Sequence, residues 1–308
     1  MISHLRALWN QRFFRLLLLA GVLLAIAGRL DLTALRAVLA RFNLAYGCAM
    51  LAVNAVLLLL FALRWRCIAR LLGIAAPLGQ FVRVTWLSAC LSELGPPLLV
   101  GEITRFQLMR QFGEQRRLLL SQLADRLSGY AVLGGAVLLL SPAYAGWFGL
   151  PSGRWPLLVA GAFGVGAVLL VRQPQIRAVL NAIPRRLVMR SAPHYAYSLL
   201  IQTLLSVNLL LAAAGLGVAQ QPGAILMLAP LLLLGISALP SLWSDWGKRE
   251  AAALFVLAPA GLTPEQALAI SLLFGFSHLL ATLPGWCLLW LKPPTHRKNN
   301  NLSATSVR

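Results

Sequence analysis

Long apolar runs alternate with short basic segments along almost the whole sequence. A transmembrane helix needs about 20 consecutive, mostly apolar residues, and several runs meet or approach that length. We therefore predict six spans that cross a bilayer, the first of them an uncleaved helix rather than a signal peptide. The predicted spans cover residues 16–27, 44–63, 118–140, 157–171, 195–216 and 264–291.

Two further apolar stretches are interrupted by helix-breaking residues. The first is broken by Pro96, Pro97 and Gly101, and the second is broken by Pro240 and Gly247. Because proline lacks the backbone N–H that a helix interior needs, each stretch is predicted to break there, and the distribution of basic residues described below favours a re-entrant hairpin over a full crossing. Broken hydrophobic segments at corresponding places in two halves of a chain are typical of a transporter-type site.

Charged residues follow both breaks within otherwise apolar surroundings. A charge at the centre of a bilayer costs about 2.5–3.5 kcal/mol on insertion scales, so such groups are kept where they are paired or hydrated. Each group of four has a net charge of zero, which favours mutual pairing. The first group is Glu102, Arg105, Asp125 and Arg126, and the second is Asp245, Lys248, Arg249 and Glu250.

The positions of Asp125 and Arg126 predict where their side chains point. Because they are adjacent on a predicted helix, they point in different directions and need different partners. We expect one or both of them to reach the hairpin that carries Glu102 and Arg105. The first charged group should then connect the hairpin to the following span.

Two interpretations of the charged groups stay open. In the functional one, which we favour because ionisable residues inside a membrane are functional by default, they and Ser241 line a polar cavity that binds a charged lipid headgroup. In the structural one, they form salt bridges that tie the hairpins to the bundle.

The last span presents a face of small and polar residues that predicts close helix packing. His278 stands on this face, where a lone histidine is more often a packing residue, and a headgroup contact or a proton relay is the alternative. The other members of the face are Ala267, Ser271, Gly275, Thr282 and Gly285. On another span, Gln202, Ser206 and Asn208 are predicted to form interhelical hydrogen bonds.

Composition places the chain among integral membrane proteins. Hydrophobic residues make up 59% of it and charged residues 11%, with a mean hydropathy of +0.77, a balance that soluble globular domains do not have. The net charge of +19 would suggest nucleic acid in a soluble protein, but these arginines lie in short loops that face lipid headgroups. We therefore expect no nucleic-acid partner. The four scattered cysteines have no metal-ligand spacing, so no metal or cofactor is expected.

The distribution of Lys and Arg predicts the orientation. If both broken stretches are re-entrant, 20 of the 27 basic residues fall on one side, which places both termini in the cytoplasm. This count treats Arg64 as part of a cytoplasmic loop and Trp65 as an interfacial anchor. The predicted fold is an all-α polytopic bundle with two inverted repeats. The repeats span about 44–140 and 195–291 of a single domain, 1–291, and residues 292–308 form a polar tail.

The usual catalytic signatures do not occur in the sequence. There is no Gly-rich phosphate loop, no His-Glu zinc motif and no defensible Ser-His-Asp order. We therefore expect a protein that is not an enzyme. An intramembrane transferase that uses one of the charged groups is the alternative.

The residues at the two charged breaks also resemble the pattern of a known protein family. In the first, residues 101–105 (Gly-Glu-Ile-Thr-Arg) follow the prolines and Asp125-Arg126 comes next; in the second, residues 247–250 (Gly-Lys-Arg-Glu) follow Pro240-Ser241. Over roughly residues 40–290, this order resembles the flippase-like membrane family found as the transmembrane region of lysylphosphatidylglycerol synthase and as stand-alone bacterial proteins.

The resemblance implies a bundle that binds lipids or moves them between the leaflets of a bacterial inner membrane. The chain has Val100-Gly101-Glu102 where a double Gly and an Asp are common in the family. We expect it to bind and translocate an anionic or polyprenyl-type lipid through its polar cavity. The alternatives are a non-transporting membrane partner of a lipid-modifying or cell-envelope enzyme, and the transferase. The oligomeric state is left open.

Overall fold

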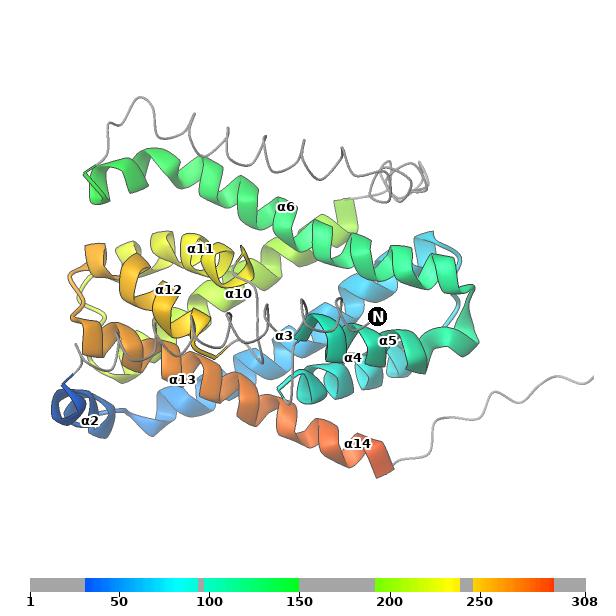
Figure 1. Cartoon of the computed structure of the whole chain (residues 1–308), viewed down its shortest axis with the longest axis horizontal. Helices are drawn as coiled ribbons and strands as arrows, with labels where there is room; N and C mark the ends of the chain where they lie inside the picture. Colours follow the sequence, from blue (N-terminus) through cyan, green and yellow to red (C-terminus); the bar gives the residue numbers. More distant parts are fainter. Residues whose placement is uncertain (1–30, 94–96, 150–191, 239–245, 291–308) are drawn as a thin grey trace, which may run out of the picture.

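The computed structural model describes residues 31–93, 97–149, 192–238 and 246–290, and these residues form helices with no strand among them (Figure 1). Four described helices are long and apolar enough to cross a membrane. They match four of the predicted spans, while 16–27 and 157–171 lie outside the described residues. The all-α membrane bundle is thus confirmed, and the total of six spans stays a prediction. The four are α3 (Leu44–Leu71), α6 (Gln115–Trp147), α10 (Ala192–Gly215) and α13 (Pro264–Thr282), the last counted with the 3-10 helix η3 (Leu283–Trp286).

Two pairs of shorter helices form the hairpins that the interrupted stretches predict. α4 (Leu78–Ser92) packs along α5 (Pro97–Met109), and α11 (Pro222–Ala238) packs against α12 (Lys248–Val256). In Figure 1 the two pairs lie toward opposite ends of the molecule, with α3 and α10 running between them and α6 passing along one edge. The inverted relation of the two halves and their orientation in the bilayer stay predictions.

The predicted breaks differ in their outcome. α5 begins at Pro97, a position where a helix tolerates proline because its first N–H groups have no partner inside the helix. Gly101 lies inside α5 rather than at a break, so that expectation is wrong. Gly247 is the N-cap of α12 with a φ of 87°, a left-handed conformation that favours glycine. Pro96, Pro240, Ser241 and Asp245 lie outside the described residues.

Short helices complete the described part. α2 (Leu32–Ala40) begins after Asp31, whose carboxylate accepts hydrogen bonds from the hydroxyl and the backbone N–H of Thr33. These bonds, and the hydroxyl bond most of all, lower the pKa of Asp31 from its ordinary value. The predicted last helix is not continuous, because α13 gives way to η3 at Pro284, whose ring and missing N–H do not fit a helix interior. The remaining elements are η1 (Arg110–Phe112), η2 (Ala258–Ala260) and α14 (Cys287–Trp290).

Three buried apolar clusters hold the described helices together, and the two larger ones bear on the site. The first lies around Trp65, which has no exposed surface, packs edge-on against Phe81 and donates a 3.1 Å hydrogen bond from Nε1 to Oγ of Ser121. The second joins α6 to the helices of the second hairpin, where the Tyr144 hydroxyl donates to the Met227 carbonyl at 2.8 Å. α3 therefore continues past its apolar run, and the expectation that Trp65 anchors an interface is wrong.

Candidate functional site

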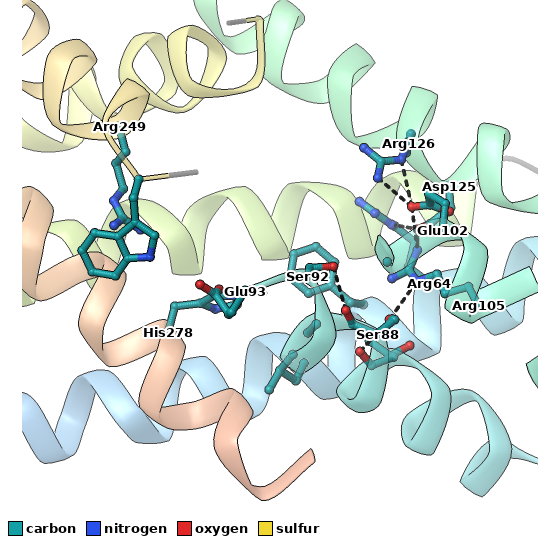
Figure 2. A pocket seen from close by; sticks show the side chains of 16 residues that line it. Arg64, Ser88, Ser92, Glu93, Glu102, Arg105, Asp125, Arg126, Arg249 and His278 are labelled. Atoms are coloured by element: carbon teal, nitrogen blue, oxygen red, sulfur yellow. Dashed lines mark hydrogen bonds and ion pairs between the residues drawn. The ribbon is translucent and has the colours of Figure 1, made fainter. Parts of the chain in front are cut away.

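A cavity of about 330 Å³ lies between the two hairpins, bounded by α3, α4, α5, α6, α13 and the start of α12 (Figure 2). Four arginines and three carboxylates line it, which leaves one net positive charge when the histidine is neutral. Its ionisable lining residues are Arg64, Glu93, Glu102, Arg105, Asp125, Arg126, Arg249 and His278.

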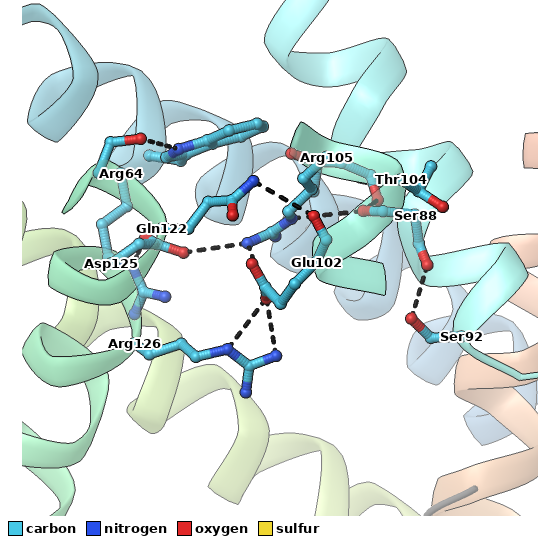
Figure 3. A network of polar contacts seen from close by, with 12 residues as sticks. Arg64, Ser88, Ser92, Glu102, Thr104, Arg105, Gln122, Asp125 and Arg126 are labelled. Carbon is cyan, nitrogen blue, oxygen red and sulfur yellow. Dashed lines mark hydrogen bonds and ion pairs between the residues drawn. The ribbon is translucent and has the colours of Figure 1, made fainter. Parts of the chain in front are cut away.

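Asp125 of α6 joins three helices. Its Oδ1 accepts a 2.7 Å hydrogen bond from Nε of Arg64 in α3, and its Oδ2 accepts one of 3.3 Å from Nη1 of Arg105 in α5 (Figure 3). The side chains of Arg64 and Asp125 are only 6% and 3% exposed. Arg64 also donates to Oγ of Ser198 in α10 at 3.2 Å. Because a buried ion needs its partner, removing either member of this pair leaves an uncompensated charge.

Glu102 of α5 holds the second arginine of α6. Nε and Nη2 of Arg126 both donate to Glu102 Oε1, at 2.9 and 2.7 Å (Figure 3). Nη1 of Arg105 lies 3.8 Å from the same oxygen. Asp125 and Arg126 therefore have different partners and both reach the first hairpin, as their adjacency in the sequence predicts.

The two helices of the first hairpin meet closely beneath these ion pairs. A Cβ at Gly101 would collide with Oγ of Ser92, whose hydroxyl donates to the Ser88 carbonyl at 2.7 Å. Arg105 donates from Nε to Oγ of Ser88 at 3.4 Å, and its guanidinium lies 5.0 Å from the centre of the Trp65 ring. Gly101 thus serves close packing, which holds Arg105 against α4.

The second hairpin contributes Arg249 to the opposite wall of the cavity (Figure 2). Nε and Nη2 of Arg249 donate to Oε1 of Glu250 at 3.1 Å each, and the guanidinium lies 4.4 Å from the centre of the Trp246 ring. Glu250 also accepts hydrogen bonds from the Gly247 backbone N–H and, at 3.3 Å, from the Ser271 hydroxyl of α13. The carboxylate therefore caps the start of α12 as well as pairing with its neighbour.

His278 and Glu93 connect α13 to the end of α4 at the cavity (Figure 2). Nε2 of His278 lies 3.9 Å from Oε1 of Glu93, and Nδ1 lies 3.4 Å from Oδ1 of Asn54 in α3. The prediction that favoured packing for His278 did not foresee its place in the cavity wall.

Most of the predicted site residues come together here. Lys248 and Glu250 belong to α12 but are not among the residues that line the cavity, and Ser241 and Asp245 lie outside the described residues. The predicted residues that line the cavity are Glu102, Arg105, Asp125, Arg126, Arg249 and His278. Within the described part of the chain, no group of three or more metal-ligating side chains is placed to hold a metal ion.

Sequence reasoning missed Arg64, Glu93 and Trp246. Arg64 was assigned to a loop, and its pairing with Asp125 adds one positive charge to the first charged group. The signal lay in the buried residues Ala62, Trp65, Ile68 and Leu72, which are spaced by three or four positions, the period of one helix face.

The polar residues of α10 also differ from expectation. The Ser206 hydroxyl donates to the Gln202 carbonyl of its own helix rather than to another helix. The Asn208 side chain is fully buried, and neither of its polar atoms has a hydrogen-bond partner among the described residues. The predicted interhelical bonds of Ser206 and Asn208 are therefore wrong.

The chain matches the model of a known family of membrane proteins. The family model described as lysylphosphatidylglycerol synthase TM region matches residues 12–285, which include every residue of the cavity. The chain belongs to this family. A search of curated proteins found no match. As a member of the lysylphosphatidylglycerol synthase transmembrane-region family, the chain is a multi-pass membrane protein of lipid metabolism.

Proposed function

We propose that the protein binds the anionic headgroup of a lipid in this cavity and moves the lipid between the two leaflets, without making or breaking a covalent bond. The observation that carries the proposal is a cavity with four arginines inside a bundle of membrane-length helices. Ionisable groups are costly in a bilayer and usually mark the path of a substrate or ion. The family's place in lipid metabolism supports a lipid as that substrate.

The size and charge of the cavity favour a headgroup. Its volume of about 330 Å³ lies at the lower end of the range for small-molecule sites, roughly 300–1,000 Å³. A phosphate group with its polar substituent fits such a space, whereas acyl or prenyl chains would stay among the apolar helix faces and the bilayer. The net positive charge of the lining matches a headgroup with one negative charge.

Arg249 is the cation that we assign to the phosphate. Arg64 and Arg105 share the buried carboxylate of Asp125, and these contacts hold three helices together. The partner of Arg249 is its own neighbour, Glu250, which already accepts two further hydrogen bonds. A guanidinium can bind phosphate through two parallel N–H donors, so Arg249 can engage a headgroup without releasing one helix from another.

The test is transfer and binding of fluorescent phosphatidylglycerol in proteoliposomes, with unlabelled polyprenyl phosphate as a competitor. Arg249→Gln should weaken headgroup binding about 10- to 100-fold, the loss expected for hydrogen bonds to a charged group. Arg117→Gln is the control, because Arg117 is an exposed arginine paired with Glu114 outside the cavity lining. Wild-type affinity in well-folded Arg249→Gln would remove the assigned site.

A non-transporting partner is the second candidate, and the bridging of three helices by Asp125 favours it because that network suits a rigid scaffold. Binding of phosphatidylglycerol without transfer between leaflets would support this candidate over transport. Strong competition by polyprenyl phosphate would instead identify the prenyl class of lipid.

The proposed orientation places both termini in the cytoplasm of a bacterial cell, with the protein in the inner membrane. Arg64 and Arg105 line the cavity rather than loops, so the basic residues that support this orientation are fewer than the sequence suggested. Reporter fusions after residue 113 and after the C-terminus would test it, and both should report the cytoplasmic side.

A further inference from the structure

The hydrogen bonds of Asn54 determine which nitrogen of His278 carries a proton. Nδ2 of Asn54 donates to the Met50 carbonyl at 2.9 Å and to Oγ of Ser277 at 3.1 Å. Since the Ser277 hydroxyl itself donates to the Phe274 carbonyl, its oxygen is the acceptor in that contact. The amide oxygen of Asn54 is therefore the atom that faces Nδ1 of His278, at 3.4 Å. A carbonyl oxygen only accepts, so Nδ1 is the protonated nitrogen.

Nε2 of His278 is then the nitrogen that takes up a second proton. It lies 3.9 Å from Oε1 of Glu93, the C-cap residue of α4, so protonation forms an ion pair between α13 and the first hairpin. The side chains of His278 and Glu93 are 35% and 21% exposed, so a proton from water can reach them. Imidazole is the side chain whose ordinary titration, near pH 6.5, falls closest to neutral pH.

Charges from the surrounding helices oppose one another at His278. α12 brings Arg249, whose guanidinium lies against Gly275, one turn before His278 on α13. α4 brings Glu93, and α3 brings Arg64 and the neutral Asn54. α2 and α10 contribute no described residue to the lining of the cavity, and across it stand the groups of α5 and α6, which are Glu102, Arg105, Asp125 and Arg126.

We propose that the cavity takes up one proton at Nε2 of His278 when an anionic headgroup binds, so that headgroup binding and proton uptake are linked. The proton comes from water and returns to water when the headgroup leaves. This inference rests on the proposed function, and it adds a second ligand to the same cavity.

The direction of the linkage follows from charge. The carboxylate of Glu93 lines the cavity beside His278. Protonation offsets that carboxylate and raises the net charge of the lining by one, so an anionic headgroup binds more tightly. Fields are stronger where water is sparse, so the effect exceeds that of a surface charge. Linkage is reciprocal: the bound headgroup raises the affinity of His278 for its proton by the same factor.

The experiment measures the affinity of the purified protein for phosphatidylglycerol in nanodiscs at about pH 5.5 and about pH 8, on either side of the imidazole titration. The phosphodiester keeps its single charge at both values, so a change in affinity reports on the protein. Wild type should bind about five- to ten-fold more tightly at the lower pH, within the usual range of coupling between two ligands. His278→Gln should bind equally at both values.

Glu93→Gln provides the second variant, and it serves if His278→Gln does not fold. Without the carboxylate, the protonated imidazole loses its ion pair with Glu93, proton uptake at Nε2 becomes less favourable, and the pH dependence should weaken. Glu114→Gln is the matched control, because Glu114 forms an exposed ion pair outside the cavity lining, and it should keep the wild-type pH dependence.

The outcomes separate the two proposals. Equal wild-type affinity at both pH values, or wild-type pH dependence in folded His278→Gln, would overturn the proton site and leave headgroup binding in place. No phosphatidylglycerol binding at either pH would overturn headgroup binding and its linkage together. Hydrogen exchange of the last turn of α4 gives a readout without lipid. After correction for the intrinsic pH dependence of amide exchange, stronger protection at the lower pH that His278→Gln abolishes would support the proton site by itself, and equal protection at both pH values would count against it.

Discussion

Around the first hairpin the carboxylates pair with arginines of other helices, whereas in the second hairpin the carboxylate pairs with an arginine of its own helix. Asp125 holds an arginine from α3 and another from α5. Glu250 pairs with Arg249, the preceding residue, and caps the first turn of α12. The ion pairs around the first hairpin therefore join α3, α5 and α6, and the ion pair of the second hairpin lies within α12.

This difference separates two uses of charge in one membrane protein. A carboxylate shared between helices is costly to disturb, because its loss strands buried arginines on other elements. A local pair leaves its arginine able to exchange partners, since no helix depends on that contact for its position. We infer that the first hairpin mainly fixes the architecture of the cavity and the second mainly meets the ligand.

Asp125→Asn should have the largest effect on stability. It leaves Arg64 and Arg105 with no carboxylate at their shared site, and breaking a buried ion pair typically costs about 3–5 kcal/mol. The apparent free energy of unfolding, measured by titration with SDS in mixed micelles, should fall by that amount. Glu114→Gln, in an exposed pair, should change it by about 0.5 kcal/mol or less. Similar losses in the two variants would contradict the structural role of Asp125.

Gly275→Ala should have an intermediate effect and should act through the second hairpin. A Cβ at position 275 would collide with the guanidinium of Arg249, so the arginine must move. Overpacking of this kind costs about 1–3 kcal/mol, and phosphatidylglycerol binding should weaken with it. Gly135→Ala is the control, because a Cβ at Gly135 meets no atom within 4 Å. If both variants bind lipid as wild type does, Arg249 is not held where the structure places it.

Ser271→Ala should have the smallest effect of the three. It removes the 3.3 Å hydrogen bond from the hydroxyl to Glu250, while the carboxylate keeps Arg249 and the Gly247 N–H as donors. The expected loss is about 0.5–1.5 kcal/mol in the same unfolding titration. Ser237→Ala, whose hydroxyl bonds to the Leu233 carbonyl of its own helix, should be close to neutral. A loss as large as that of Asp125→Asn would place the second hairpin among the architectural elements.

The sequence predicted the features that follow from local rules. Apolar run length located the four described spans, and the prolines located the first hairpin. The adjacency of Asp125 and Arg126 predicted that they take different partners, because neighbouring side chains on a helix diverge. Arg249 was singled out because charge is rare inside an apolar chain.

Features that depend on distant contacts were not predictable in this way. Arg64 pairs with Asp125 of the first charged group only because α3 continues beyond its most apolar part. Glu93 faces His278 only because α4 ends beside α13. Gly101 looked like a break, yet it is a packing residue within α5, because Ser92 of α4 fills the space of its missing side chain. A single sequence does not record which helices become neighbours.

The ion pair between Arg64 and Asp125 also has a consequence for biosynthesis. The two residues are 61 positions apart, so α3 leaves the ribosome well before its carboxylate partner is made. An arginine within a newly inserted helix costs about 2.5–3.5 kcal/mol until it is neutralised. We therefore expect the insertion of α3 to become more favourable once α6 supplies Asp125, so that the two helices complete their insertion as a pair.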